Sequence, residues 1–184
     1  MLNVAVLVSG GGTNLQAILD AKAAGALPHA KIALVLASKP GVYALERASK
    51  AGVPGIVVAR KNYAAPEEYD AALLAALREH RIDVVVLAGD VFDNEYAAVY
   101  QPEKIAALLR GIRSRFGVYA CWGNHDVSER LLAGFSFTAE NPAAEDEAYR
   151  AFFQNAGVQL LEDESVLVEN AFYLVGRQDP QRQE

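Results

Sequence analysis

Cysteine, methionine and histidine are scarce in this chain. Its 184 residues include one cysteine, one methionine and three histidines. The single cysteine, Cys121, excludes an internal disulfide and a cysteine-rich zinc site. Because Cys121 ends an apolar run, we expect it to pack as a small buried hydrophobe and not to act as a reactive thiol.

Long apolar runs and an excess of positive charge are also missing. No stretch approaches the length of a membrane helix, and no basic segment precedes an apolar run at the start of the sequence. The formal net charge is −6 at pH 7, whereas a general nucleic-acid surface needs a basic field. We therefore expect a cytoplasmic protein that binds no nucleic acid and no membrane, with any anionic ligand held in a local site.

Apolar residues make up 52% of the chain, enough for a sizeable core. Short, continuous apolar runs alternate along the chain with segments in which apolar residues recur at helical spacing. The pattern predicts strands at 3–9, 31–38, 53–59, 82–88 and 117–122, and helices at 13–24, 42–51, 66–80, 102–115 and 145–156. This alternation predicts an α/β fold, a three-layer sandwich with a mainly parallel, Rossmann-like sheet and right-handed crossovers.

The last third of the chain has a different pattern of predicted secondary structure. It predicts a helical turn at 128–133, a loop at 135–144, short strands at 158–161, 165–169 and 172–175, and a frayed tail at 179–184. The short strands predict a mixed or antiparallel region at the C-terminal edge of the sheet. No linker rich in proline, glycine and serine divides the chain, so we expect residues 1–184 to form a single fused domain.

A glycine-rich turn, Ser9-Gly10-Gly11-Gly12-Thr13-Asn14, follows the first predicted strand and opens the first helix. Glycines let backbone amides approach a phosphate closely, and a helix N-terminus adds unpaired donors and a positive dipole. The turn has neither the lysine of a Walker loop nor a complete dinucleotide fingerprint. On these residues alone, a phosphate cradle and a turn without a ligand are equally supported.

Residues 1–89 resemble the N-terminal half of phosphoribosylglycinamide formyltransferase, also called glycinamide ribonucleotide formyltransferase. The matching segments are the run from Val4 to Ile18, Ala37-Ser38-Lys39, Ala44-Leu45-Glu46-Arg47-Ala48 and Asp83-Val84-Val85-Val86-Leu87-Ala88-Gly89. The resemblance implies that the loop matching Gly12, Thr13 and Asn14 holds the 5′-phosphate of a ribonucleotide. With Gly11, these are the candidate phosphate-binding residues.

The catalytic half of that family has no counterpart here. The Asn-x-His-Pro motif of the family is missing from the sequence, as are its folate-binding loops after Gly89. Pro66 stands where the family has an arginine before Glu-Tyr-Asp. We therefore expect no competent formyltransferase.

A second set of polar residues follows the fourth and fifth predicted strands. Asp90 and Asn124 offer oxygen ligands to a cation, at the carboxyl edge where parallel sheets usually bind ligands. His125 can stabilise a developing charge or protonate a leaving group, and Asp93 can orient an imidazole.

This second half, residues 90–178, resembles the calcineurin-like metallophosphoesterases through Gly89-Asp90-Val91-Phe92-Asp93 and Gly123-Asn124-His125-Asp126. The resemblance implies that Asp90 and Asn124 bind a divalent metal such as manganese, iron or zinc, and that His125, supported by Asp93, assists the leaving group. The family's opening Asp-x-His is replaced by Val8-Ser9-Gly10, and its late histidines are missing. We expect weak metal binding at most.

The change of resemblance falls within the fourth predicted strand. We hypothesise a chimera, engineered or naturally recombined, that is joined between about Asp83 and Asp90. We expect it to keep the phosphate loop, to bind a phosphorylated, ribonucleotide-like small molecule, and to lack efficient catalysis. The alternative is a weak metal-dependent phosphoesterase.

An exposed sheet edge in such a chimera would favour self-association. The aromatic residues that can cover this edge, or pack in the core instead, are Phe135, Phe137, Phe152 and Phe153.

Overall fold

The computed structural model describes residues 1–89, 91, 92, 96, 99–123, 129–132, 135–138 and 142–177, with 129–132, 135–138 and 142–146 described by their backbone. The elements are β1 (Leu2–Val8), α1 (Thr13–Ala23), β2 (Ala30–Ala37), α2 (Tyr43–Lys50), β3 (Gly55–Val57), η1 (Arg60–Asn62), α3 (Pro66–Glu79), β4 (Val84–Ala88), α4 (Pro102–Arg110), β5 (Val118–Cys121), β6 (Glu129–Leu132), β7 (Phe135–Thr138), α5 (Pro142–Asn155), β8 (Val158–Leu161), β9 (Glu164–Val168) and β10 (Phe172–Gly176).

Six parallel strands form the central sheet, in the order β3-β2-β1-β4-β5-β8. β4 lies in the interior of this sheet, where it pairs with β1 on one side and with β5 on the other. Val85, for example, is in register with both Ala5 and Val118. Strands from both halves of the chain therefore share one continuous sheet.

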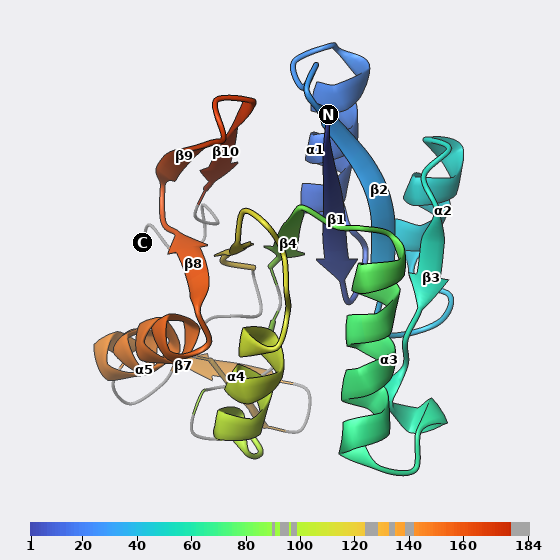
Figure 1. Cartoon of the computed structure of the whole chain (residues 1–184). Helices are drawn as coiled ribbons and strands as arrows, with labels where there is room; N and C mark the ends of the chain where they lie inside the picture. Colours follow the sequence, from blue (N-terminus) through green and yellow to red (C-terminus); the bar gives the residue numbers. More distant parts are fainter. Residues whose placement is uncertain are drawn as a thin grey trace.

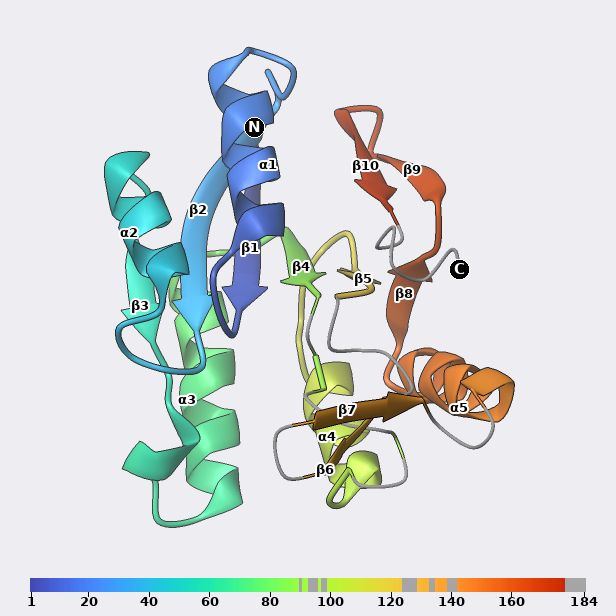
Figure 2. The ribbon, with the colours of Figure 1, turned by 180° about the vertical axis from the view of Figure 1, so that it is seen from behind.

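Two layers cover this sheet (Figures 1 and 2). α3, α4 and α5 pack on one face, and α1 and α2 pack on the other, together with the antiparallel β9–β10 hairpin. We call the second of these the hairpin face. The arrangement confirms the predicted α/β sandwich, with a small antiparallel sheet at its C-terminal edge.

Right-handed crossovers explain which face each helix covers. The chain moves outward from β1 through α1 and α2 to β3, and in the opposite direction from β4 through α4 and α5 to β8. Because the crossovers have the same hand but run in opposite directions along the sheet, α1 and α2 lie on one face and α4 and α5 lie on the other. Over β4 and β5, the hairpin face therefore has no helix in the described part of the chain, and the β9–β10 hairpin lies beside this gap.

Aromatic side chains dominate the core on the face opposite the hairpin. The rings of Phe92, Trp122, Tyr149, Phe152 and Phe153 pack against one another, with centroid separations that include 4.8 Å between Phe92 and Phe152. Phe152 and Phe153 are 3% and 1% exposed. Both therefore pack in the core instead of covering an edge. The side chains of Phe135 and Phe137 lie outside the described residues.

Several sequence predictions differ from the structure. The segment predicted as a helical turn contains β6, and the segment predicted as a loop contains β7, so the two form a hairpin. α5 begins at Pro142, three residues earlier than predicted, and α4 ends at Arg110 instead of 115. The predicted frayed tail at 179–184 lies outside the described residues. None of the described helices is both long enough and apolar enough to cross a membrane.

Candidate functional site

The loops after β1, β4 and β5 leave the same edge of the sheet, because these three strands are adjacent and parallel. The edge lies where the strand order changes direction between β1 and β4. In open α/β sheets, ligands bind in the crevice at such a point.

The glycine-rich turn after β1 leads directly into α1. Gly12 is the N-cap residue, with a left-handed φ of 72°, and no side chain caps the helix. A Cβ on Gly12 would lie 2.7 Å from the Cβ of Ala44, whereas a Cβ on Gly10 or Gly11 would meet nothing within 4 Å. The turn is therefore packed against α2 on one side and open on the other.

The open side of the turn carries the first amides of α1. The first N–H groups of any α-helix lack intrahelical acceptors, and the helix dipole adds positive potential there. Thr13 is the first helical residue and is exposed, so the N-cap position belongs to Gly12. This geometry suits an oxyanion such as a phosphate.

Arg47 on α2 holds the turn in place. Its Nε donates a hydrogen bond of 2.9 Å to the carbonyl of Gly11, and its Nη1 donates one of 2.7 Å to Oε1 of Gln16 on α1. The guanidinium also lies 4.7 Å from the ring centroid of Tyr43. Sequence reasoning did not identify Arg47 as a site residue, because 36 positions separate it from Gly11.

Asn14 connects the turn to the strands of the second half. Its Nδ2 donates to the carbonyl of Ala88 at 3.1 Å and to Sγ of Cys121 at 3.6 Å. Ala88 ends β4 and Cys121 ends β5. The side chain predicted to bind phosphate is thus also the physical link between the glycine-rich turn and the second group of loops.

The candidate metal and catalytic residues Asp90, Asp93, Asn124 and His125 lie outside the described residues. The residues that lead into these motifs, Gly89 and Gly123, are close together. A Cβ on Gly89 would lie 2.8 Å from the Cα of Gly123, and Gly89 has a φ of 78°.

The described residues do not provide a metal centre. Among them, no group of three or more histidine, cysteine, aspartate or glutamate side chains is placed to hold a metal ion. His29 and His80 lie near the amino ends of β2 and β4, away from the candidate site.

A partly buried polar contact supports the loop after β5. Nε1 of Trp122 donates a hydrogen bond of 2.9 Å to Oε1 of Glu162, and Arg150 on α5 forms a 3.0 Å ion pair with the same carboxylate. Trp122 is 2% exposed. These contacts fix the backbone immediately before Gly123.

Two family models match the chain, and they overlap. The formyl transferase family matches residues 2–91, and the calcineurin-like phosphoesterase family matches residues 63–178. The overlap, 63–91, contains α3 and β4.

Relatives of known function cover the first half. The trifunctional purine biosynthetic protein adenosine-3 of Drosophila melanogaster is 48% identical over 87 residues, which are 47% of this chain and 6% of that protein. Phosphoribosylglycinamide formyltransferase of Haemophilus influenzae is 46% identical over 89 residues, which are 48% of this chain and 42% of that protein. The chain thus spans less than half the length of these relatives.

A solved structure extends the likeness beyond the first half. Glycinamide ribonucleotide transformylase 1 from Geobacillus kaustophilus is 32% identical, with a TM-score of 0.50, and the match covers 82% of this chain and 68% of that one. The chain belongs to the glycinamide ribonucleotide transformylase family through its first half and to the calcineurin-like phosphoesterase family through residues 63–178.

Proposed function

We propose that the chain is a chimera that binds a phosphorylated, ribonucleotide-like small molecule at Gly11, Gly12, Thr13 and Asn14 and does not transfer a formyl group. The observation that carries this proposal is the open, uncapped N-terminus of α1, held by Arg47. The Haemophilus influenzae relative that shares this segment is named for phosphoribosylglycinamide, which carries a phosphate on a ribose.

The junction is proposed to lie between Asp83 and Asp90. Both family models include β4, and β4 is paired on each side with a strand from a different half. Joining the two halves within β4 preserves the register of this strand with both neighbouring strands. Such a junction needs no linker, which agrees with the continuous sheet.

The missing Asn-x-His-Pro motif supports the second part of the proposal, because positioned acid–base groups contribute about 10²–10⁴-fold to a rate. A transfer assay with a formyl folate donor should therefore give no product above the uncatalysed rate. Measurable transfer by the purified chain would contradict this part.

Phosphate binding is tested by NMR titration with ribose 5-phosphate, with ribose as the matched neutral ligand. We expect the amide signals of Gly11 to Asn14 to move with ribose 5-phosphate alone. The variant Arg47→Met frees the turn and should weaken binding about tenfold or more, since a hydrogen bond from a charged group contributes about 1.5–3 kcal/mol. Arg113→Met, on an exposed arginine elsewhere, is the control. No movement at millimolar ligand would show that the turn is only structural.

A metal-dependent phosphoesterase is the second candidate. The close approach of Gly89 and Gly123 favours it, because this contact joins the loops that lead to Asp90 and Asn124. In this proposal Asp90 and Asn124 would hold manganese, iron or zinc, which would supply Lewis acidity, and His125 would protonate the leaving group with Asp93 behind it.

Hydrolysis of a chromogenic phosphodiester, with and without manganese, distinguishes this candidate from simple phosphate binding. Turnover that requires manganese and disappears in Asp90→Ala would establish it. Asp20→Ala, which removes an equal charge from the surface of α1, should leave any turnover unchanged. If Asp90→Ala keeps the activity of the unmodified chain, the candidate is excluded.

A further inference from the structure

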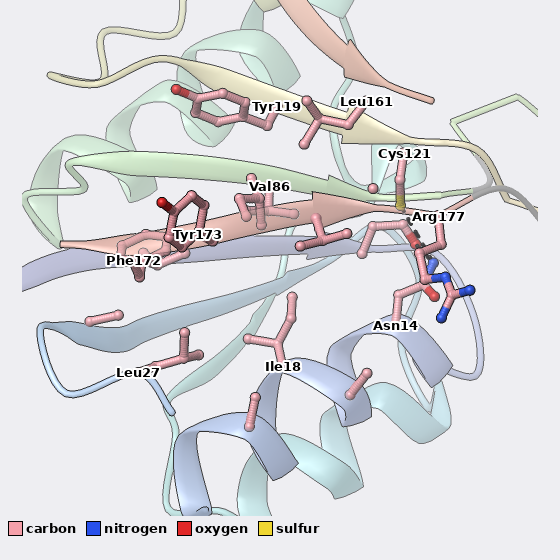
Figure 3. A pocket seen from close by; sticks show the side chains of 18 of the residues that line it. Asn14, Ile18, Leu27, Val86, Tyr119, Cys121, Leu161, Phe172, Tyr173 and Arg177 are labelled. Atoms are coloured by element: carbon pink, nitrogen blue, oxygen red, sulfur yellow. Dashed lines mark hydrogen bonds between the residues drawn. The ribbon is translucent and has the colours of Figure 1, made fainter. Parts of the chain in front are cut away.

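A cavity of about 360 Å³ opens on the hairpin face, in the gap over β4 and β5 that no described helix covers. One wall is α1 and the opposite wall is β10, while the floor is formed by β1, β4 and β5 (Figure 3). Its volume is within the range of small-molecule sites. The phosphate proposal shares Asn14 with this cavity, and neither that proposal nor the phosphoesterase proposal uses the rest of its lining.

The wall from α1 is a single helix face with small residues. Asn14, Ala17, Ile18 and Ala21 line the cavity, and their spacing of three and four positions puts them on one side of the helix. The alanines keep α1 from filling the space. Over about 10 Å of helix axis, these residues therefore make an elongated, mostly apolar wall.

The two ends of the cavity differ in polarity. Asn14, Cys121 and Arg177 lie at one end, and Leu27, Phe172 and Tyr173 lie at the other (Figure 3). Among the described lining residues, Arg177 carries the single formal charge. No carboxylate in the described part of the chain forms an ion pair with Arg177.

An apolar channel with one cation at its end is complementary to a particular class of molecule. We infer that this cavity binds an amphiphilic anion, with a medium-length alkyl chain between α1 and β10 and an acidic headgroup at Arg177 and Asn14. The ligand's alkyl chain buries apolar surface, and its headgroup accepts hydrogen bonds from the guanidinium of Arg177. A fatty carboxylate and an alkyl phosphate share this chemistry.

Cys121 provides the readout, because it is the single cysteine and lines the headgroup end, and it is half-buried instead of fully buried as the sequence suggested. A bound ligand should slow the reaction of Cys121 with a maleimide at least fivefold. The probes are decanoate and decyl phosphate below their micellar concentrations. The controls, called half-ligands, are decanol, which has the alkyl chain without the acidic headgroup, and inorganic phosphate, which has the anion without the alkyl chain. We expect both anionic amphiphiles to protect Cys121 at concentrations where neither half-ligand does.

The length of the ligand's alkyl chain gives a second test of the inference. Each methylene buried in an apolar site contributes about a fourfold gain in affinity. Affinity should therefore rise in steps from hexanoate through octanoate to decanoate. It should then level off once the alkyl chain is longer than the cavity. A flat series would overturn the inference.

Two pairs of variants test the location. Ala21→Phe fills the cavity and should weaken decanoate binding at least tenfold, whereas Ala23→Phe, on the same helix but outside the lining, should not. Arg177→Gln should weaken decanoate and leave decanol unaffected, while Arg113→Gln should change neither. Circular dichroism confirms that each variant is folded, and binding that survives both Ala21→Phe and Arg177→Gln would refute the site.

A second copy of the chain is the competing occupant. In that case, protection of Cys121 would grow with protein concentration in the absence of any amphiphile. That result would contradict the inference.

Discussion

Gly12 is the residue whose backbone the glycine-rich turn most clearly requires. Its φ of 72° is unfavourable for residues with a Cβ, and a Cβ there would press on Ala44 at 2.7 Å. Gly12→Ala should therefore lower the free energy of unfolding by about 1–3 kcal/mol, measured by urea denaturation. Gly11→Ala is the matched control, since its Cβ would meet nothing within 4 Å, and it should change stability by less than about 0.5 kcal/mol. Equal losses in the two variants would show that the contact with α2 is unimportant.

Asp70 on α3 offers a test of charge at the scale of one side chain. Partial burial, together with the negative charge of Glu67, raises the pKa of Asp70, although Arg60 acts in the opposite direction. A raised pKa means that the folded state binds the proton more tightly, so ionised Asp70 opposes folding above its folded pKa. Asp70→Asn should stabilise the protein at pH 7 by a few tenths of a kcal/mol, about the size of one like-charge pair on a helix.

The gain from Asp70→Asn should disappear as the pH falls below the pKa of an unfolded aspartate, because both proteins are then neutral at this position. Thermal melts at several pH values between 3 and 7 measure the difference. Asp20→Asn, on exposed α1, controls for the change in net charge. A stabilisation that persists unchanged at the lowest pH would contradict the charge argument.

At the scale of elements, the regular strands and helices of the first half were predictable, because β-branched runs and helical spacing alternate there without conflict. The β6–β7 hairpin was missed because Glu129, Leu131 and Leu132 favour a helix, and pairing with β7 overrides this local preference. Pro142 lies within the segment predicted as a loop, yet its fixed φ suits the first turn of α5. The glycine-rich turn was predictable as a site, whereas the bracing contact from Arg47 depends on tertiary structure.

The β9–β10 hairpin is held to the main sheet at a position that excludes a side chain. A Cβ on Gly176 would lie 2.5 Å from the carbonyl oxygen of Leu161 at the end of β8. Gly176→Ala should push the hairpin away and lower stability by about 1–3 kcal/mol. Amide hydrogen exchange should show the largest increase in β9 and β10, and Val175→Ala, at an exposed neighbouring position, should show little. An increase spread evenly over the sheet would mean that the hairpin does not open separately.

The whole molecule is expected to unfold as one unit despite its two family relationships. β4 pairs with strands of both halves, and the core on the hairpin face joins Leu15 of α1 to Leu161 of β8. Both leucines are almost fully buried, so Leu15→Ala and Leu161→Ala should each cost about 2–5 kcal/mol. Because the two sites lie in one cooperative structure, either substitution should move the same single transition. Fluorescence of Trp122, which reports on the second half, should then coincide with far-ultraviolet circular dichroism of the whole chain in urea. Two separate transitions, with Leu15→Ala shifting only the one that Trp122 does not report, would show that the shared strand joins the halves without coupling their stability.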